Sequence, residues 1–246
     1  MILRQFLHAD PVAASYLFGC GGQSAGAVVD PVGDIEPYLK AAEATGMRLR
    51  YVIDTHIHAD HISSARELAK AAGAEYVLFA YADVSFPFKR VNDGDLLELG
   101  NVVIRVLHTP GHTPEHISLV VTDRTRSQEP WFILTGHTLM VGDLGRTELA
   151  TSAEEGARIL YRTAQSLKEL PDYLEVLPGA YSGSVCGRSL SGKPTSTIGF
   201  EKRNNEALLI DNEDEFVRIM VADIPVPPAA AATIRAVNSG RDVAAA

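Results

Sequence analysis

The sequence is short of cysteine: Cys20 and Cys186 are the only two in 246 residues. So few cysteines exclude a disulfide framework, and their separation excludes a paired-cysteine metal clip. We expect both to be small buried thiols in a reducing compartment. A reactive Cys186 is the alternative, because it lies in a segment rich in Gly and Ser that is predicted to be a loop.

Positive charge is also scarce, since 22 Lys and Arg residues face 31 Asp and Glu residues and leave a net charge of −9. This balance argues against nucleic acid or an anionic membrane as the main partner. No segment approaches the run of about 18 apolar residues that a membrane span needs. Residues 1–11 are too short and polar for a secretory signal, so we expect a cytoplasmic protein.

The hydrophobic content of 46% is that of a globular protein with a real core. Strands are predicted at 2–8, 15–20, 25–29, 49–53, 76–80, 96–99, 102–107, 117–122, 131–134 and 174–177, and helices at 34–45, 63–72, 153–169 and 200–209. The predicted elements fall into two sets, and in each set several strands precede the helices. This order predicts two sheets packed face to face with helices outside, a single α/β domain with four layers in the order αββα. We expect that catalytic domain to span 1–224 and the tail 225–246 to be loosely packed or disordered.

Three of the eight histidines lie within six residues, directly after the predicted strand 49–53. His56 and His58 are two residues apart, so they project to the same side of an extended backbone. Asp60 and His61 follow at the predicted entry of a helix and can turn toward the same cavity. Imidazole is the commonest ligand of zinc and iron, and three ligands with an open position make a catalytic site. The cluster therefore predicts a metal centre.

Two further histidines follow predicted strand ends. The Pro110-Gly111 pair forces a turn and presents His112 at the tip of a loop, a common place for functional side chains. His137 lies in a Gly-rich loop after another strand. We expect His108 and His116 to form local hydrogen bonds and not to bind metal.

The metal is expected to be held mainly by His56, His58 and His112. Two hypotheses remain open for His137: it joins them as a ligand, or it points away. Imidazoles from separate strand-end loops would in either case converge on one cation that stays partly open to substrate.

Taken in order, these segments resemble the metallo-β-lactamase superfamily over about residues 1–210. Within it the sequence looks most like the persulfide dioxygenases, relatives of glyoxalase II. The similarity is carried by the segments GDLGRT (142–147), SVCGR (184–188) and TIGFEKRN (197–204). The resemblance implies the pattern HxHxDH, a His after Pro-Gly, an Asp in Thr-Gly-Asp and a His in Pro-Gly-His. Five positions match it: His56, His58, Asp60, His61 and His112. The expected Asp is His137, and the expected final His is Ala180.

These two departures disfavour a dinuclear zinc hydrolase. An imidazole is a poor bridge between two cations, and Ala180 cannot bind metal at all. The resemblance implies instead one Fe(II) held by His56, His112 and His137. Zn(II) is the alternative, because three neutral imidazoles and an open position suit zinc at least as well.

Asp60 and His61 are then the catalytic candidates. Asp60 is expected either to orient a histidine ligand or to act as a base. The resemblance also brings a set of candidate substrate-binding side chains near the mouth of the site: Arg146, Tyr181, Arg188 and Lys193. Basic groups there would meet the carboxylates of a glutathione-like thiol. The alternative for each is a solvated loop residue or a loop-to-loop hydrogen bond.

Three functions stay open. The first is a mononuclear iron oxygenase that converts a low-molecular-weight thiol persulfide and oxygen to sulfite and the thiol. The second is a mononuclear zinc hydrolase of a thioester, ester or lactone. The third is a member of the superfamily that keeps its metal but has lost catalysis. The expected partner in the first two is a small molecule, and a homodimer is left open.

Overall fold

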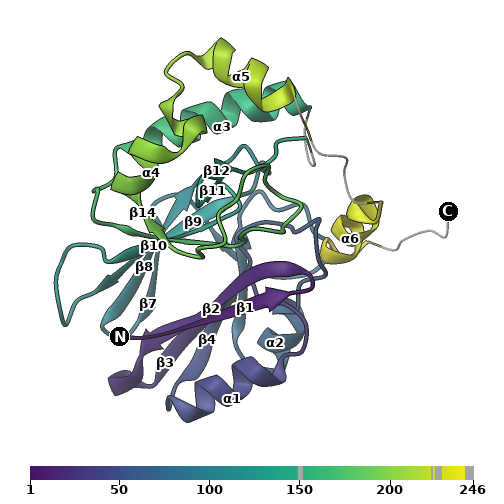
Figure 1. The fold of residues 1–246 in the computed structure, drawn as a ribbon. Helices are drawn as coiled ribbons and strands as arrows, with labels where there is room; N and C mark the ends of the chain where they lie inside the picture. The colour runs from purple at the N-terminus through teal and green to yellow at the C-terminus, as the bar shows by residue number, and fades with distance from the viewer. Residues whose placement is uncertain (149–151, 223, 225–228, 242–246) are drawn as a thin grey trace.

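Two mixed β-sheets pack face to face, and helices cover the outer face of each sheet (Figure 1). The computed structural model describes residues 1–148, 152–222, 224 and 229–241. The layers follow the predicted order αββα, and that prediction is confirmed. Among the described residues, no helix is both long and apolar enough to cross a lipid bilayer.

The first sheet has six strands that neighbour one another in chain order. They are β1 (Ile2–Ala9), β2 (Val12–Cys20), β3 (Ala25–Val29), β4 (Arg48–Ile53), β5 (Glu75–Phe79) and β6 (Lys89–Val91). β1, β2 and β3 pair antiparallel, whereas β3 to β6 pair parallel. Parallel neighbours need crossover connections, and two of these contain α1 (Glu36–Ala44) and α2 (Ala65–Ala72). Both helices pack their apolar faces on the outside of this sheet.

The second sheet runs in the order β14-β13-β10-β9-β8-β7. Its strands are β7 (Leu96–Leu99), β8 (Val102–His108), β9 (Ile117–Asp123), β10 (Phe132–Gly136), β13 (Glu175–Pro178) and β14 (Ser196–Thr197). Only β10 and β13 pair parallel. The helices over it are α3 (Ala153–Lys168), α4 (Ile198–Asn204) and α5 (Glu213–Ala222). Smaller elements are the hairpin β11 (Leu139–Met140) with β12 (Asp143–Leu144), and the 3-10 turns η1 (Gly21–Gln23) and η2 (Glu206–Leu209).

The core between the sheets is built from strand residues that alternate inward. Phe18 of the first sheet meets Phe132 of the second edge to face, with ring centroids 5.6 Å apart. Ile104 and Leu119 belong to the same core, and both are fully buried. Burial of this apolar surface fixes the two sheets against each other, and it therefore fixes the loops at their common edge.

The predicted long elements are present with boundaries that shift by at most three residues, except that the helix predicted at 200–209 divides at Asn205 into α4 and the 3-10 turn η2. Ser152 caps α3 as expected, since its side chain accepts a hydrogen bond from the Glu155 amide. Strands of two or three residues, such as β6 and β14, were not predicted, because a run that short carries no periodicity. Helix α5 was not predicted either, and its amphipathic residues pack Phe216 against the α3 layer.

The C-terminal tail differs from the expectation of a loosely packed or disordered segment. Residues 231–238 form the helix α6 (Ala231–Asn238), which lies to one side of the two sheets (Figure 1). The Ala-rich composition that suggested weak packing also favours helix strongly, and the helix is anchored by polar side chains instead of a large apolar face. Residues 225–228 and 242–246 of the expected tail lie outside the described residues.

Replacement of Phe132 by Ala is expected to lower the free energy of unfolding by about 3–5 kcal/mol, because the side chain is fully buried between the sheets and leaves a cavity. Denaturant unfolding measures the loss. The matched control is Phe200→Ala, where the ring is 52% exposed and the change should stay within about 0.5 kcal/mol. Equal effects of the two variants would contradict the assignment of this core.

Candidate metal centre

Three loops that follow strand ends bring the histidines to one edge of the two sheets. The metal loop, defined here as residues 54–63, follows β4. His112 follows β8, and His137 comes directly after β10. The fold thus brings together histidines that lie up to 81 positions apart in the sequence.

The donor nitrogens of His56, His112 and His137 all lie within 4.8 Å of one another, and we call these three residues the imidazole set. Their ring centroids are 4.8 to 5.2 Å apart. All three side chains are buried. His56 Nε2 and both ring nitrogens of His137 have no hydrogen-bond partner. Buried polar atoms without partners are costly, so this arrangement fits a bound cation.

Hydrogen bonds fix the orientation of two of these rings. The Thr55 hydroxyl donates to Asp30 Oδ2 at 2.9 Å, so it accepts from His56 Nδ1, also at 2.9 Å. His112 Nδ1 donates to the Arg146 carbonyl oxygen at 2.7 Å. In both rings Nε2 is left with its lone pair, the form in which a histidine binds metal.

Burial also keeps the imidazole set uncharged. Burial and the nearby histidines hold the pKa of His56 well below its ordinary value. Burial lowers the pKa of His112 to about 3 and that of His137 to about 4. The three rings are therefore neutral at neutral pH, as ligands must be.

A second group, the carboxylate set, consists of His58, Asp60 and His61, whose donor atoms also lie within 4.8 Å of one another. Asp60 Oδ1 is 3.6 Å from His58 Nδ1, and Asp60 Oδ2 is 3.1 Å from His61 Nδ1. We expected His58 to act with His56 and His112. Its donor atom instead groups with Asp60 and His61, and its role as a ligand stays a prediction.

The carboxylate set differs from the imidazole set in the pKa shifts of its side chains. Burial alone would lower the pKa of His58, but the charge and hydrogen bond of Asp30 raise it well above its ordinary value. Burial alone would raise the pKa of Asp60, but the nearby His61 and polar contacts with the His58 and His61 rings hold it well below the ordinary range. An ionised carboxylate of this kind suits binding a cation or orienting a ring better than accepting a proton.

Asp30 organises both sets, and the sequence analysis missed it. Its Oδ1 accepts from the Thr55 amide at 2.7 Å and lies 3.1 Å from His58 Nε2. It follows β3 directly, with a positive φ of 48° that side-chain-bearing residues rarely adopt. In the sequence, Asp30 lies between a predicted strand and Pro31. Single Asp residues in such places are common, so this one could not be identified as functional without the fold.

Two glycines let the loops approach closely enough to form the site. A Cβ on Gly136, where φ is +49°, would lie 2.5 Å from both His116 Nε2 and Thr55 Oγ1. A Cβ on Gly145 would lie 2.1 Å from the His137 carbonyl oxygen and 3.1 Å from His112 Nδ1. Larger residues at these positions would displace the imidazole set.

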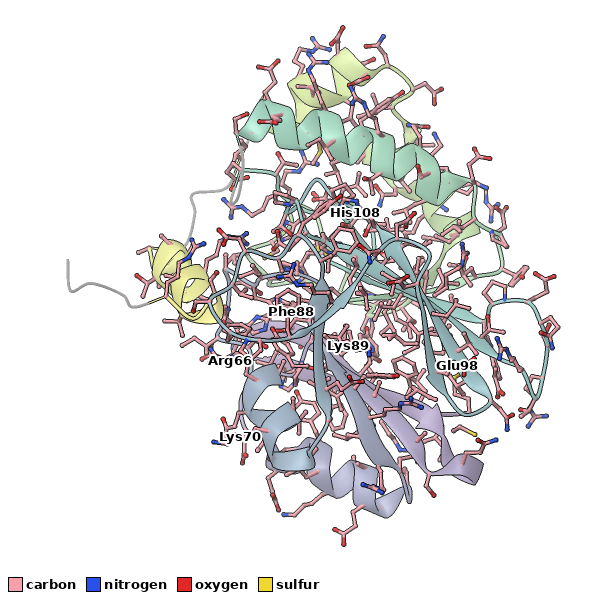
Figure 2. All side chains as sticks on the ribbon, turned by 180° about the vertical axis from the view of Figure 1, so that it is seen from behind. Arg66, Lys70, Phe88, Lys89, Glu98 and His108 are labelled. Atoms are coloured by element: carbon pink, nitrogen blue, oxygen red, sulfur yellow. The ribbon has the colours of Figure 1, made fainter. Side chains whose placement is uncertain are left out.

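His108 and His116 form hydrogen bonds, as expected, although those of His116 also reach residues distant in the sequence; that neither binds metal stays a prediction. His116 is buried, with Nδ1 3.0 Å from the hydroxyls of Thr109 and Thr138. Its Nε2 accepts from the His137 amide at 3.1 Å, so it supports a candidate ligand from behind. His108 hydrogen-bonds the Pro114 carbonyl oxygen at 2.8 Å, at the end of β8 (Figure 2).

Arg146 and Arg188 are held by carboxylates of the chain itself. The Arg146 guanidinium pairs with Glu148, and Nη1 donates to the Val185 carbonyl oxygen at 2.9 Å. Arg188 Nη2 donates to the buried Asp143 at 2.9 Å. Substrate contact by either arginine stays a prediction.

Tyr181 and Lys193 also have partners within the chain. The Tyr181 hydroxyl donates to the His8 carbonyl oxygen at 2.8 Å, and Lys193 Nζ donates to Thr195 Oγ1 at 3.0 Å. Lys193 lines a surface cavity together with aromatic side chains that include Trp131, and no histidine lines it. Their proposed roles toward substrate likewise stay predictions.

The helix α6 holds the metal loop through a group that we call the C-terminal clamp, Arg235 and Asn238. Asn238 Nδ2 donates to the carbonyl oxygens of His58 (2.9 Å) and His61 (2.8 Å), and Oδ1 accepts from the Ser63 amide at 3.0 Å. Arg235 donates to the Ile57 carbonyl oxygen at 2.7 Å. The backbone that carries the ligands is therefore fixed by residues about 180 positions away. No periodic or motif signal marked them.

Replacement of Thr55 by Val removes the hydroxyl that links Asp30 to His56 while keeping the side-chain shape. We expect the dissociation constant for a bound divalent metal to rise about 10–100-fold, because the His56 ring loses its tautomer and orientation. Chelator competition measures it. Thr122→Val on β9 is the matched control, and an unchanged affinity in Thr55→Val would contradict this role.

Replacement of Asn238 by Ala leaves three backbone groups of the metal loop without their partner. We expect the free energy of unfolding of the full chain to fall by about 1–3 kcal/mol. We also expect metal to dissociate faster. Thr233→Ala, an exposed position on the same helix, should leave both measurements unchanged. A clamp variant that matches this control would show that α6 does not support the loop.

Comparisons with known proteins agree with this geometry. Two curated relatives with different activities match most of the chain. The mitochondrial persulfide dioxygenase ETHE1 of Homo sapiens is 26% identical over 89% of this chain and 80% of its own. A hydroxyacylglutathione hydrolase of Rhodospirillum rubrum is 29% identical over 81% of this chain and 83% of its own.

Two solved structures have the same fold over nearly the whole chain. A metallo-beta-lactamase from Staphylococcus aureus superposes with a TM-score of 0.93 at 34% identity, over 99% of this chain and 74% of that one. ETHE1 from Myxococcus xanthus superposes with a TM-score of 0.83 at 29% identity, over 98% of this chain and 100% of that one. The family model of the metallo-beta-lactamase superfamily matches residues 10–179, which include both donor sets. The chain therefore belongs to the metallo-beta-lactamase superfamily.

Proposed function

We propose that this chain oxidises a low-molecular-weight thiol persulfide with dioxygen, giving sulfite and the thiol, at a single Fe(II) held by His56, His112 and His137. The observation that carries the proposal is the convergence of these three buried, neutral imidazoles, of which His56 and His137 have ring nitrogens without a hydrogen-bond partner. The persulfide dioxygenase relative supports the choice of substrate. Zn(II) is the alternative metal, because neutral imidazoles suit it as well.

The imidazole set, whose donor atoms all lie within 4.8 Å of one another, fits such a cation. When bound, a divalent iron with three protein ligands supplies open coordination positions at which a persulfide and dioxygen can be brought together. The protein residues hold the rings in place: Thr55 and Asp30 orient His56, and the Arg146 carbonyl oxygen orients His112. Burial excludes water from the rings and limits side reactions of the persulfide.

Asp60 and His61 lie beside the imidazole set but are not among the three residues proposed to hold the iron. We propose that Asp60 orients His58 and His61 and supplies negative charge to the site, since the low pKa of its carboxyl group makes it a weak base. The family position that would complete a second histidine ligand here is Ala180, which is fully buried and carries no donor. This supports one-metal chemistry over a two-metal hydrolase.

The substrate side of the proposal rests on the loops around the site. A glutathione-like persulfide carries carboxylates that basic side chains would bind, and Arg146 and Arg188 lie on loops next to His112 and Cys186. Each must release an internal carboxylate, Glu148 or Asp143, before it can bind one on a substrate.

A zinc hydrolase of a thioester, ester or lactone is the second candidate. It is favoured by one observation: the set has no carboxylate ligand, and three neutral imidazoles are a common zinc-binding group in catalytic sites. The hydroxyacylglutathione hydrolase relative supports this alternative at similar identity. The two candidates differ in their need for oxygen, which makes them separable.

Protein purified anaerobically without added metal is expected to contain about one iron per chain and to consume oxygen when given glutathione persulfide. Sulfite is the product to be measured. His137→Ala should abolish both iron binding and oxygen uptake, because it removes one of three ligands. His108→Ala is the matched control, since that histidine hydrogen-bonds outside the imidazole set and should leave both intact.

Each result selects among the candidate functions. Iron-loaded protein without oxygen uptake on any persulfide tested would overturn the dioxygenase proposal. Zinc-loaded protein that hydrolyses a glutathione thioester without oxygen would establish the hydrolase instead. Absence of both activities, with stability that still depends on metal, would indicate a member that binds metal without turnover.

A further inference from the structure

Cys186 is a buried thiol that the proposed reaction does not use. Its side chain is 1% exposed, and its sulfur lies within 4.8 Å of donor atoms of both Asp60 and His137. The sequence analysis favoured inert packing for this residue. Inert packing accounts poorly for a thiol that faces a carboxylate and an imidazole.

The fold fixes the backbone around this thiol from several directions. The Arg146 amide donates to the Cys186 carbonyl oxygen at 3.2 Å, and the Cys186 amide donates to Ser184 Oγ at 3.2 Å. Two residues further on, the Arg188 amide donates to Asp143 at 2.7 Å. Hydrogen bonds on both sides of Cys186 therefore fix the position of its backbone, and with it the position of the sulfur.

A second, independent observation points to a ligand between these groups. Both ring nitrogens of His137 are buried without a hydrogen-bond partner, and so are both carboxylate oxygens of Asp60, which lie 3.6 Å from His58 Nδ1 and 3.1 Å from His61 Nδ1. The Asp60 side chain is 4% exposed and His137 is fully buried. Ala180, which contributes no donor, is also buried in the loop that follows β13. A cation would bind the unpartnered atoms of Asp60 and His137, and the Cys186 sulfur lies within reach of the same ion.

We propose that Cys186 is a thiolate ligand and that, together with Asp60 and His137, it forms a donor set for a thiophilic divalent cation such as Zn²⁺ or Co²⁺. When the cation binds, the S–H bond breaks, a metal–sulfur bond forms and the proton leaves to solvent, with no change of oxidation state. Sulfur ligands favour zinc and cobalt over magnesium, calcium or manganese. The inference goes beyond the proposed oxidation, because it requires neither a persulfide nor oxygen.

His137 belongs to this set and to the imidazole set, and a neutral ring has one lone pair to give. The two sets are therefore alternatives for His137 and not two sites filled together. An ion that prefers sulfur is drawn toward Cys186 and Asp60, whereas an ion that prefers nitrogen stays with His56 and His112.

Cobalt titration of the metal-free full chain under anaerobic conditions tests the proposal. We expect a sulfur-to-cobalt charge-transfer absorption in the near ultraviolet that saturates at about one cobalt per chain. Cys186→Ser should lose this absorption. Cys20→Ser, the same substitution at the other buried cysteine, should retain it. Loss of the band in Cys20→Ser with retention in Cys186→Ser, or no band in the unaltered protein, would overturn the proposal.

X-ray absorption at the zinc edge of the unaltered protein provides a test that needs no variant to fold. We expect one sulfur neighbour at about 2.3 Å. A shell of nitrogen and oxygen alone would overturn the thiolate ligand. Since neither measurement involves turnover, failure here leaves the oxygen-uptake experiment to decide the proposed function separately.

Discussion

The candidate site depends on the burial of imidazoles that keep ring nitrogens without a partner in the protein. Packing the two sheets together takes His56, His112 and His137 out of water, and burial of this kind makes an unpaired nitrogen costly. A bound cation would relieve this cost, so the same packing that stabilises the fold would also create affinity for a metal. The glycines at 136 and 145 belong to this constraint, because they let the loops come close enough for the nitrogens to converge.

The orientation of the rings depends on a layer of residues behind them. Asp30 connects two strand ends by binding Thr55 and His58 at once, and His116 supports the His137 amide. These groups have no free donor toward the centre and would be overlooked in a search for ligands. They are nonetheless what allows His56 to present one nitrogen while Thr55 holds the other, and what supports the backbone of His137.

The sequence predicted the four-layer fold and the clustering of the histidines because both leave local signals: strand and helix periodicity, and histidines placed after strand ends. It left two hypotheses open for His137, which lies in space with His56 and His112. It did not find Asp30 or Asn238, whose roles arise only from contacts between distant segments. The expectation for the tail from residue 225 was wrong for the described helix α6, because hydrogen bonds to backbone carbonyls leave no trace in composition.

The C-terminal clamp would link the binding of metal to the docking of helix α6. Asn238 binds the backbone that presents His58 and His61, so a metal held through this loop and the docking of α6 would be thermodynamically linked, each strengthening the other by the same free energy. Without metal, α6 would then detach more often and expose the loop to proteases. The supply of metal would in that case set how much of the protein persists as well as how much of it is loaded.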